Sequence, residues 1–318
     1  MTIATNTYTS FTAKGIREEL ADVIYNISPT DTPFMTKASR GKLTNTFFEW
    51  QTDALATAST SNAQLEGDDI TAYDAVTPTV RLGNYAQIAR KTAVVSDTQD
   101  VLDTAGRKSE LAYQISKKSA ELKRDVAASL MDNIATVAGN TTTARVTGSL
   151  LAFIKSNIDK GVGGVAPVYT TTPSDVWTNG TQRAFTETIL KNVMQQCYTN
   201  GATITDLLVG ASNKQTASGF AGIASLRMNQ NIVKQASVIG AADVYLSDFG
   251  ELSIVPNRFQ RARDAFFIDY NFVSVDYLRP FAQKPLAKTG DAEKRLIVVE
   301  YGLRVKNEKA LGVAVDLS

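Results

Sequence analysis

The most regular hydrophobic pattern in the chain lies between residues 104 and 138. Charged residues fill the other positions of this stretch, and Gly139 and Asn140 behind it commonly end helices. The apolar residues recur in steps of three and four, the spacing of one helical face: Leu111, Ile115, Leu122, Val126, Leu130, Ile134 and Val137. The pattern predicts one rod of roughly 45–50 Å, a length that suits a structural spine.

A long two-stranded excursion is predicted for residues 43–98. Its outgoing limb, 43–55, is rich in threonine and aromatic residues, including Trp50, and its return limb, 75–95, alternates apolar and polar positions. The tip, 56–69, is small and polar. A hairpin of this length cannot bury itself, so we expect it to lie on the body of its own chain or on a neighbour.

Residues 1–36 are polar with scattered apolar positions, whose spacing predicts a short amphipathic helix near 14–25. Pro29 and Pro33 then predict an extended or turned backbone, because proline lacks an amide hydrogen. Phe34 is expected to anchor this turn in an apolar site.

The middle of the chain predicts a small α/β unit. Residues 141–180 are rich in glycine and threonine and predict mostly loop, and the glycines of 161–164 lack the lysine of a nucleotide-binding loop. A helix over 182–199, a buried strand at 207–209 and a loose helix near 212–226 follow.

From residue 243 the pattern is that of strands. Residues 244–246 and 252–255 flank Asp248-Phe249-Gly250 and predict a hairpin. Further strands are predicted at 266–268, 273–278, 296–305 and 312–317. The chain as a whole is therefore expected to be an α+β protein.

The composition limits the classes of function that the chain can have. Of the 318 residues, 43% are hydrophobic, enough for a sizeable core. Only 20% are charged, below the ~25% typical of soluble proteins, and chains of this kind often bury surface in an assembly. The net charge is +1, so nothing indicates the concentrated basic face of a dedicated DNA clamp.

The residue counts exclude several chemistries. The chain has no histidine, which excludes a Ser-His-Asp triad, a Cys-His pair and a histidine-ligated zinc. Its one cysteine, Cys197, lies on the apolar line of a predicted helix and is interpreted as a packing thiol. The sequence shows no secretory signal, and its apolar runs fall far short of the ~20 residues of a membrane span.

The acidic residues of the predicted tip are Glu66, Asp68 and Asp69. They could coordinate a cation, but the spacing of a calcium-binding loop is absent, so a solvated acidic tip is the favoured interpretation. No spacing elsewhere marks out a catalytic carboxylate pair. We expect neither a cofactor nor a metal site.

The order of elements resembles the major capsid protein of tailed double-stranded DNA bacteriophages, whose fold is shared with encapsulin shells. The segment Ile27-Ser-Pro-Thr-Asp-Thr-Pro-Phe34, with Trp50 beyond it, is similar to the opening of one phage capsid subfamily. The resemblance implies an N-terminal arm, an extended E-loop, a P-domain with a spine helix, and an A-domain. Its expected bounds are 1–38 for the arm, 39–98 for the E-loop and flanking P-domain strand, 99–140 for the spine helix, 141–260 for the A-domain and 261–318 for the return strands, with a P-loop near 284–294.

The resemblance also implies partners. The chain is expected to assemble with itself into the pentamers and hexamers of an icosahedral shell, with a separate scaffolding protein, a portal protein and non-specifically bound DNA, and without a membrane. Assembly would take place in the host cytoplasm and end in the virion capsid. Expected assembly contacts are Phe34, Trp50, Glu66, Asp68 and Asp69. Candidate DNA-facing residues are Lys117, Lys118, Lys123 and Arg124, although an ordinary solvated helix face is the favoured interpretation of these four.

Two other functions stay open at this point. One is an encapsulin-type nanocompartment shell with an enzyme cargo, which would share the fold. The other is a carboxylate-dependent hydrolase, which a deep acidic cleft would favour. Lateral contacts that bury the hairpin would favour a shell.

Some members of the capsid lineage join subunits by an isopeptide bond between an E-loop lysine and a P-domain asparagine. Residues 43–80 contain no lysine and residues 280–306 contain no asparagine. We predict that mature particles run as single chains in denaturing electrophoresis. A ladder of covalent oligomers would contradict this.

Overall fold

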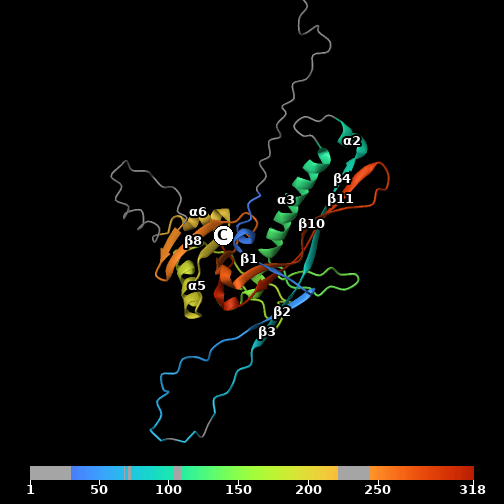
Figure 1. The fold of residues 1–318 in the computed structure, drawn as a ribbon. Helices are drawn as coiled ribbons and strands as arrows, with labels where there is room; N and C mark the ends of the chain where they lie inside the picture. The colour runs from blue at the N-terminus through green and yellow to red at the C-terminus, as the bar shows by residue number, and fades with distance from the viewer. Residues whose placement is uncertain (1–29, 68, 71–72, 103–108, 221–243) are drawn as a thin grey trace, which may run out of the picture.

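The structure is a computed structural model, and its fold consists of two sheets and a projecting hairpin (Figure 1). The described residues are 30–67, 69–70, 73–102, 109–220 and 244–318. The helix predicted near 14–25 and the acidic residue Asp68 lie outside these ranges.

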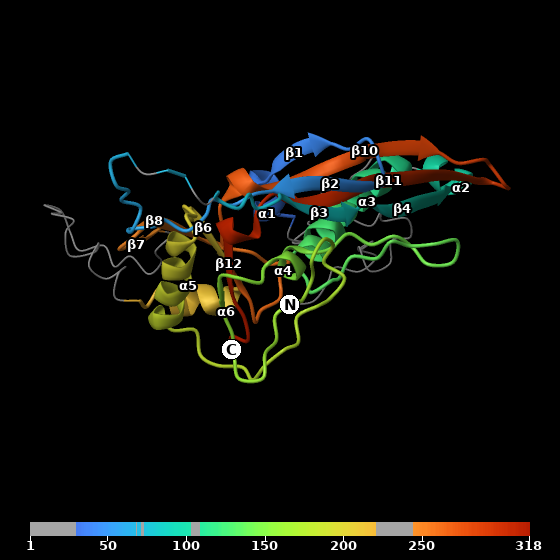
Figure 2. The same cartoon turned by 90° about the horizontal axis from the view of Figure 1, so that it is seen from below.

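A four-stranded sheet and one long helix form one half of the molecule (Figures 1 and 2). In spatial order, the strands are β1 (Ser39–Lys42), β10 (Val273–Pro285), β11 (Ala292–Val305) and β4 (Gln87–Ser96). β1 is parallel to β10, and the other neighbours are antiparallel. Helix α3 (Glu110–Leu130) packs over β4 and β11 through a buried stripe that includes Leu122 and Val126.

The long helix is shorter than the pattern predicts. It begins after Ser109, whose hydroxyl accepts the amide hydrogen of Ala112, and it spans 21 residues. Ile134 then donates its amide hydrogen to the Ser149 hydroxyl, and Val137 pairs with the strand-like Val146. The predicted helical continuation to 138 is wrong because these tertiary contacts satisfy the backbone and override the local periodicity.

A six-stranded sheet forms the other half. In spatial order, its strands are β5 (Ile158–Asp159), β12 (Leu311–Ala314), β9 (Ala265–Ile268), β6 (Asp206–Val209), β8 (Gly250–Pro256) and β7 (Val244–Ser247). Helix α5 (Glu187–Thr199) packs against β5 and β12, and α6 (Ala211–Ala217) contacts β8. The shorter elements are α2 (Asp97–Val101), α4 (Leu150–Phe153), η1 (Tyr270–Phe272) and η2 (Glu308–Ala310). The strand at 207–209 and the hairpin around Gly250 confirm the sequence predictions.

The long hairpin is paired only at its base. Strands β2 (Phe47–Thr52) and β3 (Val80–Tyr85) are antiparallel in full register, whereas the described residues between 53 and 79 form no strand. The predicted return limb divides at the buried Ala86, beyond which β4 joins β11 instead. The alternation in this limb therefore belongs to two sheets and not to one hairpin.

Residues 30–32 have no regular structure, as expected, but a helix begins at Pro33, where an extended or turned backbone was also expected. Helix α1 (Pro33–Lys37) places Pro33 at its first position, where the missing amide hydrogen costs nothing. Phe34 is 1% exposed and lies in the main core of its own chain, so the expected apolar anchor is confirmed.

The glycine-rich stretch at 161–164 wraps the buried carboxylate of Asp316. This side chain accepts hydrogen bonds from the amides of Gly161 at 3.2 Å and Gly180 at 2.9 Å, and from Arg263 at 2.7 Å. A Cβ atom on Gly161 would lie 2.2 Å from the carbonyl oxygen of Thr181. The glycines therefore permit a close approach that ties this loop to the C-terminal segment that follows β12 (Leu311–Ala314).

Asp264 lies fully buried beside this network. Its carboxylate is 3.3 Å from the Arg261 guanidinium, yet neither oxygen has a hydrogen-bond partner among the described residues. Burial raises the pKa of Asp264 from an ordinary value of 3.8 to about 7, although Arg261 and Arg263 favour the charged form. The fold therefore holds the proton more tightly than the unfolded chain does.

We predict that Asp264→Asn stabilises the unassembled chain more at pH 8 than at pH 5. In the wild type the free energy of unfolding falls as pH rises from 3.8 to about 7 and levels off above that value. The variant has no carboxyl at this position, so it should lose this contribution to the pH dependence of the free energy of unfolding. Thermal unfolding of both proteins at both pH values measures the difference. The exposed Asp291→Asn change is the control, and an equal effect of Asp264→Asn at both pH values would contradict the prediction.

Candidate assembly surfaces

The base of the hairpin is fixed by aromatic packing. The half-buried Trp50 lies with its ring centroid 5.9 Å from that of Phe48 and 5.9 Å from that of Phe153. A Cβ atom on Gly302 of β11 would lie 2.4 Å from the Phe48 ring, so the glycine admits this ring against the central strand. The Arg304 guanidinium lies over both β2 rings, at 5.6 and 5.9 Å. Trp50 therefore joins the hairpin to its own body.

A buried amide also anchors the base. Asn84 of β3 is fully buried and donates hydrogen bonds to the Leu303 carbonyl at 2.7 Å and the Thr147 hydroxyl at 3.0 Å. Its carbonyl oxygen accepts from the Thr136 hydroxyl and the Gly148 amide, each at 2.9 Å. The sequence analysis missed this residue, because an asparagine in a strand pattern carries no signal that separates an anchor from a solvated position.

Beyond this base, the chain forms a projecting excursion of residues 53–79. Its described apolar side chains are nearly all solvent-exposed, among them Leu55 at 99% and Val76 at 92%. Glu66 and Asp69 are exposed as the sequence predicts, and Asp68 lies outside the described residues. An apolar segment this exposed is typical of a surface that another molecule covers.

Phe34 and Trp50 differ from these tip residues in position. Both lie in contact with the core of their own chain, and Phe34 has almost no exposed surface. The structure therefore separates the four described members of this set into core anchors, Phe34 and Trp50, and exposed carboxylates at the tip, Glu66 and Asp69.

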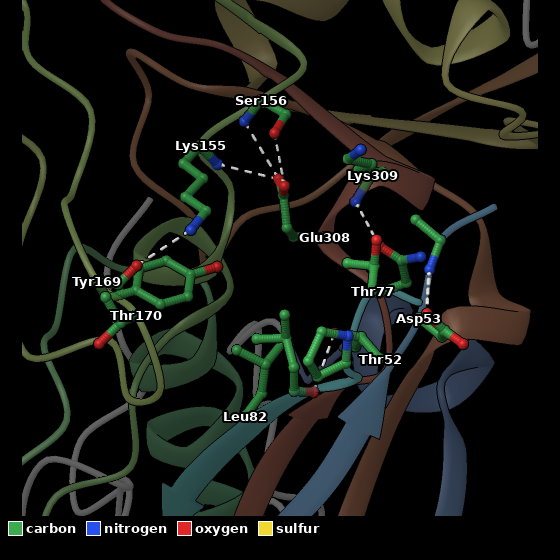
Figure 3. A pocket seen from close by; sticks show the side chains of 14 residues that line it. Thr52, Asp53, Thr77, Leu82, Lys155, Ser156, Tyr169, Thr170, Glu308 and Lys309 are labelled. Atoms are coloured by element: carbon green, nitrogen blue, oxygen red, sulfur yellow. Dashed lines mark hydrogen bonds between the residues drawn. The ribbon is translucent and has the colours of Figure 1, made fainter. Parts of the chain in front are cut away.

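A cleft lies where the hairpin leaves the body (Figure 3). Its volume is about 340 Å³, and its walls include both limbs of the excursion, near Asp53 and Thr77, and the body near Glu308. The Glu308 carboxylate accepts hydrogen bonds from the Ser156 hydroxyl at 2.5 Å and amide at 3.1 Å. Asp53 accepts the amide hydrogen of Ala54 at 2.9 Å. Both carboxylates are engaged by their own chain, so this cleft lends no support to a hydrolase.

The four basic residues of α3 do not share one side of the helix. At ~100° per residue, Lys117 and Arg124 fall on the line turned away from the sheet. Lys118 donates to Glu121 at 2.8 Å and lowers the pKa of that carboxyl. Lys123 lines a hollow of about 310 Å³ beside β10. Only Lys117 and Arg124 therefore share a line of the helix, and of these two Lys117 is exposed and Arg124 is half-buried.

A second basic cluster was missed by the sequence analysis. Arg90, Lys91 and Thr92 of β4 line, with Lys118 of α3, a hollow of about 420 Å³, which we call the basic notch. Lys91 donates to the Asp125 carboxylate at 2.7 Å, which raises the pKa of the lysine. Lys118 is 26 positions beyond Thr92 in sequence, so only the packing of α3 on β4 brings the two parts of the notch together.

Other kinds of site find no support in the described residues. None of their helices has the length and apolar character that crossing a bilayer requires. Within the same residues, the acidic and thiol side chains form no group of three that could hold a metal ion. Burial raises the pKa of the Cys197 thiol to about 12, as expected for a packing residue.

Solved structures define the class of fold. The chain is similar to the capsid asymmetric unit of cyanophage A-1(L), with 12% identity, a TM-score of 0.66, and coverage of 98% of this chain and 99% of that one. It is also similar to a chain of Gordonia phage Cozz, with 12% identity, a TM-score of 0.62, and coverage of 99% and 97%. A holo-SrpI encapsulin complex from Synechococcus elongatus matches with 10% identity, a TM-score of 0.55, and coverage of 95% and 92%. The fold is therefore the tailed-phage capsid fold, which encapsulins share.

Sequence relatives identify the family. The family model of the SU10 major capsid protein matches residues 3–318. The major capsid protein of Escherichia phage Phieco32 is 29% identical, with 96% of each chain covered. The chain belongs to the SU10 major capsid protein family and is a major capsid protein of a tailed phage, which confirms the resemblance seen in the sequence.

We predict that Trp50→Ala loosens the hairpin base. The lost contacts with Phe48 and Phe153 should lower the free energy of unfolding by about 2–3 kcal/mol, less than a fully buried aromatic residue contributes. Amide hydrogen exchange should become faster in β2 and β3 than in β10. Leu55→Ala, at a position without packing, is the control, and unchanged exchange in β2 and β3 would refute the prediction.

Proposed function

We propose that the chain assembles with copies of itself into pentamers and hexamers of an icosahedral shell around packaged double-stranded DNA. The observation that carries this proposal is the excursion of residues 53–79, which exposes apolar side chains that its own chain leaves uncovered. A neighbouring subunit is the partner present in greatest supply in a capsid, and burying these side chains on it would stabilise the shell.

The parts of the fold suit the roles that the resemblance implies. The excursion with β2 and β3 is proposed as the E-loop, and the four-stranded sheet with α3 as the P-domain. The six-stranded sheet with α5 and α6 is proposed as the A-domain, which extends the expected bounds of 141–260 by β9 and β12, two strands from the range expected to return to the P-domain. The turn between β10 and β11 is proposed as the P-loop, since both strands extend it beyond the core.

The outward line of α3 is proposed as a DNA-facing surface. Lys117 and Arg124 lie two helical turns apart on the side of α3 that faces away from the sheet. Two cations of this kind contribute a weak attraction to phosphates, without sequence specificity. A scaffolding protein, a portal protein and assembly in the host cytoplasm complete the proposal.

The encapsulin alternative has less support. The encapsulin match rests on the fold at 10% identity, whereas the family and the sequence relative are phage capsid proteins. A shell diameter too small to enclose a genome would favour the encapsulin alternative.

Negative-stain electron microscopy of the expressed chain, alone and with its scaffolding partner, tests the proposal. We expect closed shells or capsomer rings from the wild type. A variant without residues 56–70 should fold, because its two cores are intact, and should yield few particles.

Two outcomes would overturn the proposal. A monomeric wild type under every condition would contradict self-assembly. Normal particles from the deletion variant would show that the excursion is not an assembly element.

A further inference from the structure

The chain contains two asparagine-glycine pairs with the same residue before them. The sequence Thr-Asn-Gly stands at 178–180 and again at 199–201. In such a pair the glycine has no side chain that keeps its amide nitrogen away from the asparagine Cγ atom. Attack of this nitrogen on Cγ expels ammonia and closes a five-membered succinimide ring. Because the two local sequences are so alike, any difference in their reactivity must come from their surroundings in the fold.

The amide nitrogen of Gly180 lies against a buried carboxylate. Its N–H donates to Oδ1 of Asp316 at 2.9 Å, and Asp316 is 1% exposed. Arg263 donates to the same oxygen at 2.7 Å and to the Gly180 carbonyl at 2.9 Å, which fixes the two residues to each other. A Cβ atom at position 180 would lie 2.6 Å from the Gly164 amide nitrogen, so only glycine brings its amide this close. General-base catalysis requires a contact of this kind between the base and the proton of the nucleophile.

The backbone of Asp316 is itself unusual. Its φ is 62°, the one positive φ of a non-glycine residue in the ranges that the structure describes. Residues other than glycine seldom adopt this conformation, and such residues are often found at functional sites. The hydrogen bonds from the surrounding amides and from Arg263 hold the carboxylate in this position.

A cation holds the side chain of Asn179 at the electrophilic end. The Arg261 guanidinium donates to Oδ1 of Asn179. Because a guanidinium has donors only, the atom that it meets is the amide oxygen and not the amide nitrogen. The Asp264 carboxylate, 3.3 Å from Nε of Arg261, holds the guanidinium from its other edge. Negative charge that develops on Oδ1 during attack at Cγ therefore meets a fixed positive charge.

The second pair lacks both features. The Gly201 amide donates to the Tyr198 carbonyl at 2.9 Å, which is a neutral acceptor. Asn200 ends α5 and donates its Nδ2 hydrogen to Asn157 at 2.6 Å, and its Oδ1 accepts from no lysine or arginine of the described chain. The pair at 200–201 is therefore a matched reference within the same molecule.

We propose that Asn179 and Gly180 form a self-modification site, at which the folded chain converts Asn179 into a succinimide and then into aspartate or isoaspartate. Asp316 is the base, and Arg261 stabilises the charge on the side-chain oxygen. The proposal goes beyond self-assembly, because the reaction takes place within one folded chain and needs no second copy.

The reaction balances with water as its one co-reactant. The Gly180 nitrogen gives its proton to Asp316 and forms a bond to Cγ of Asn179. The bond between Cγ and Nδ2 then breaks, and the proton passes from Asp316 to the departing nitrogen, which leaves as ammonia. Asn179 is exposed, so water reaches the ring and opens it at either carbonyl carbon. The chain gains one negative charge beside Arg261 and, in the isoaspartate product, one methylene group in its backbone.

Incubation of the full-length chain at neutral pH tests the proposal. Peptide mass spectrometry follows the loss of ammonia at each pair, and isoaspartate-specific methylation follows the hydrolysed product. In the folded chain we expect Asn179 to convert about tenfold or more faster than Asn200, because a placed base and a charge-stabilising donor each accelerate the reaction. In urea both pairs lose their partners, so the two rates should become similar. Equal rates in the folded chain, or a faster reaction of Asn179 in urea than in the fold, would overturn the proposal.

Variants at the two catalytic residues give a second test. Arg261→Gln removes the cation but keeps Asp316, and it should slow the conversion of Asn179 about tenfold or more. Asp316→Asn removes the base and should slow it as well. Arg258→Gln, at an exposed arginine three positions before Arg261, is the matched control and should react as the wild type does.

The second pair also reports on the fold of each variant. A variant that unfolds converts Asn200 at the rate measured in urea, and Arg261→Gln then decides if Asp316→Asn has unfolded. An unchanged rate at Asn179 in a folded Arg261→Gln variant would show that the cation takes no part, which would overturn the proposal.

Discussion

Burial of the central strand β11 is the constraint on which the rest of the structure depends. It pairs with β10 on one side and β4 on the other, and it carries α3 on one face. Gly302 admits the Phe48 ring, and the Tyr301 hydroxyl is 2.7 Å from that of Ser129 on α3. The hairpin base, the helix and the sheet therefore all take their positions from one buried strand.

Buried polar groups fix the positions of β11 and of the elements that pack on it. The Glu300 carboxylate is almost fully buried and accepts from Arg145 at 2.5 Å and Arg279 at 2.7 Å. The Asn84 side chain makes five hydrogen bonds with the body. Any shift of these strands would leave a buried charge or amide without a partner, which costs more than the loss of an equal apolar contact. A rigid base of this kind lets a hairpin that cannot bury itself project in a fixed direction.

The sequence predicts the elements that local spacing determines, and it misses those that tertiary contacts determine. The buried strand at 207–209 and the hairpin around Gly250 follow from short apolar runs and a turn, and the structure has both. The helix over 104–138 is too long because Ile134 and Val137 keep the helical spacing while their backbones bond elsewhere. At the candidate assembly surfaces, the exposed carboxylates of Glu66 and Asp69 are readable from composition. The basic notch is not readable in this way, because its residues come together only when α3 packs on β4.

The net charge of +1 conceals a separation of charge along the chain. Five of the 32 carboxylates lie in residues 53–79, which leaves 33 basic against 27 acidic residues elsewhere. A chain with the same composition but mixed charges would also be nearly neutral, yet it would offer no preferred contact between copies. Separation allows weak, screened attractions that are directional because each copy carries both signs at different places. Repeated around a closed assembly, such contacts can select one packing without a single strong bond, provided that each subunit has already satisfied its own core.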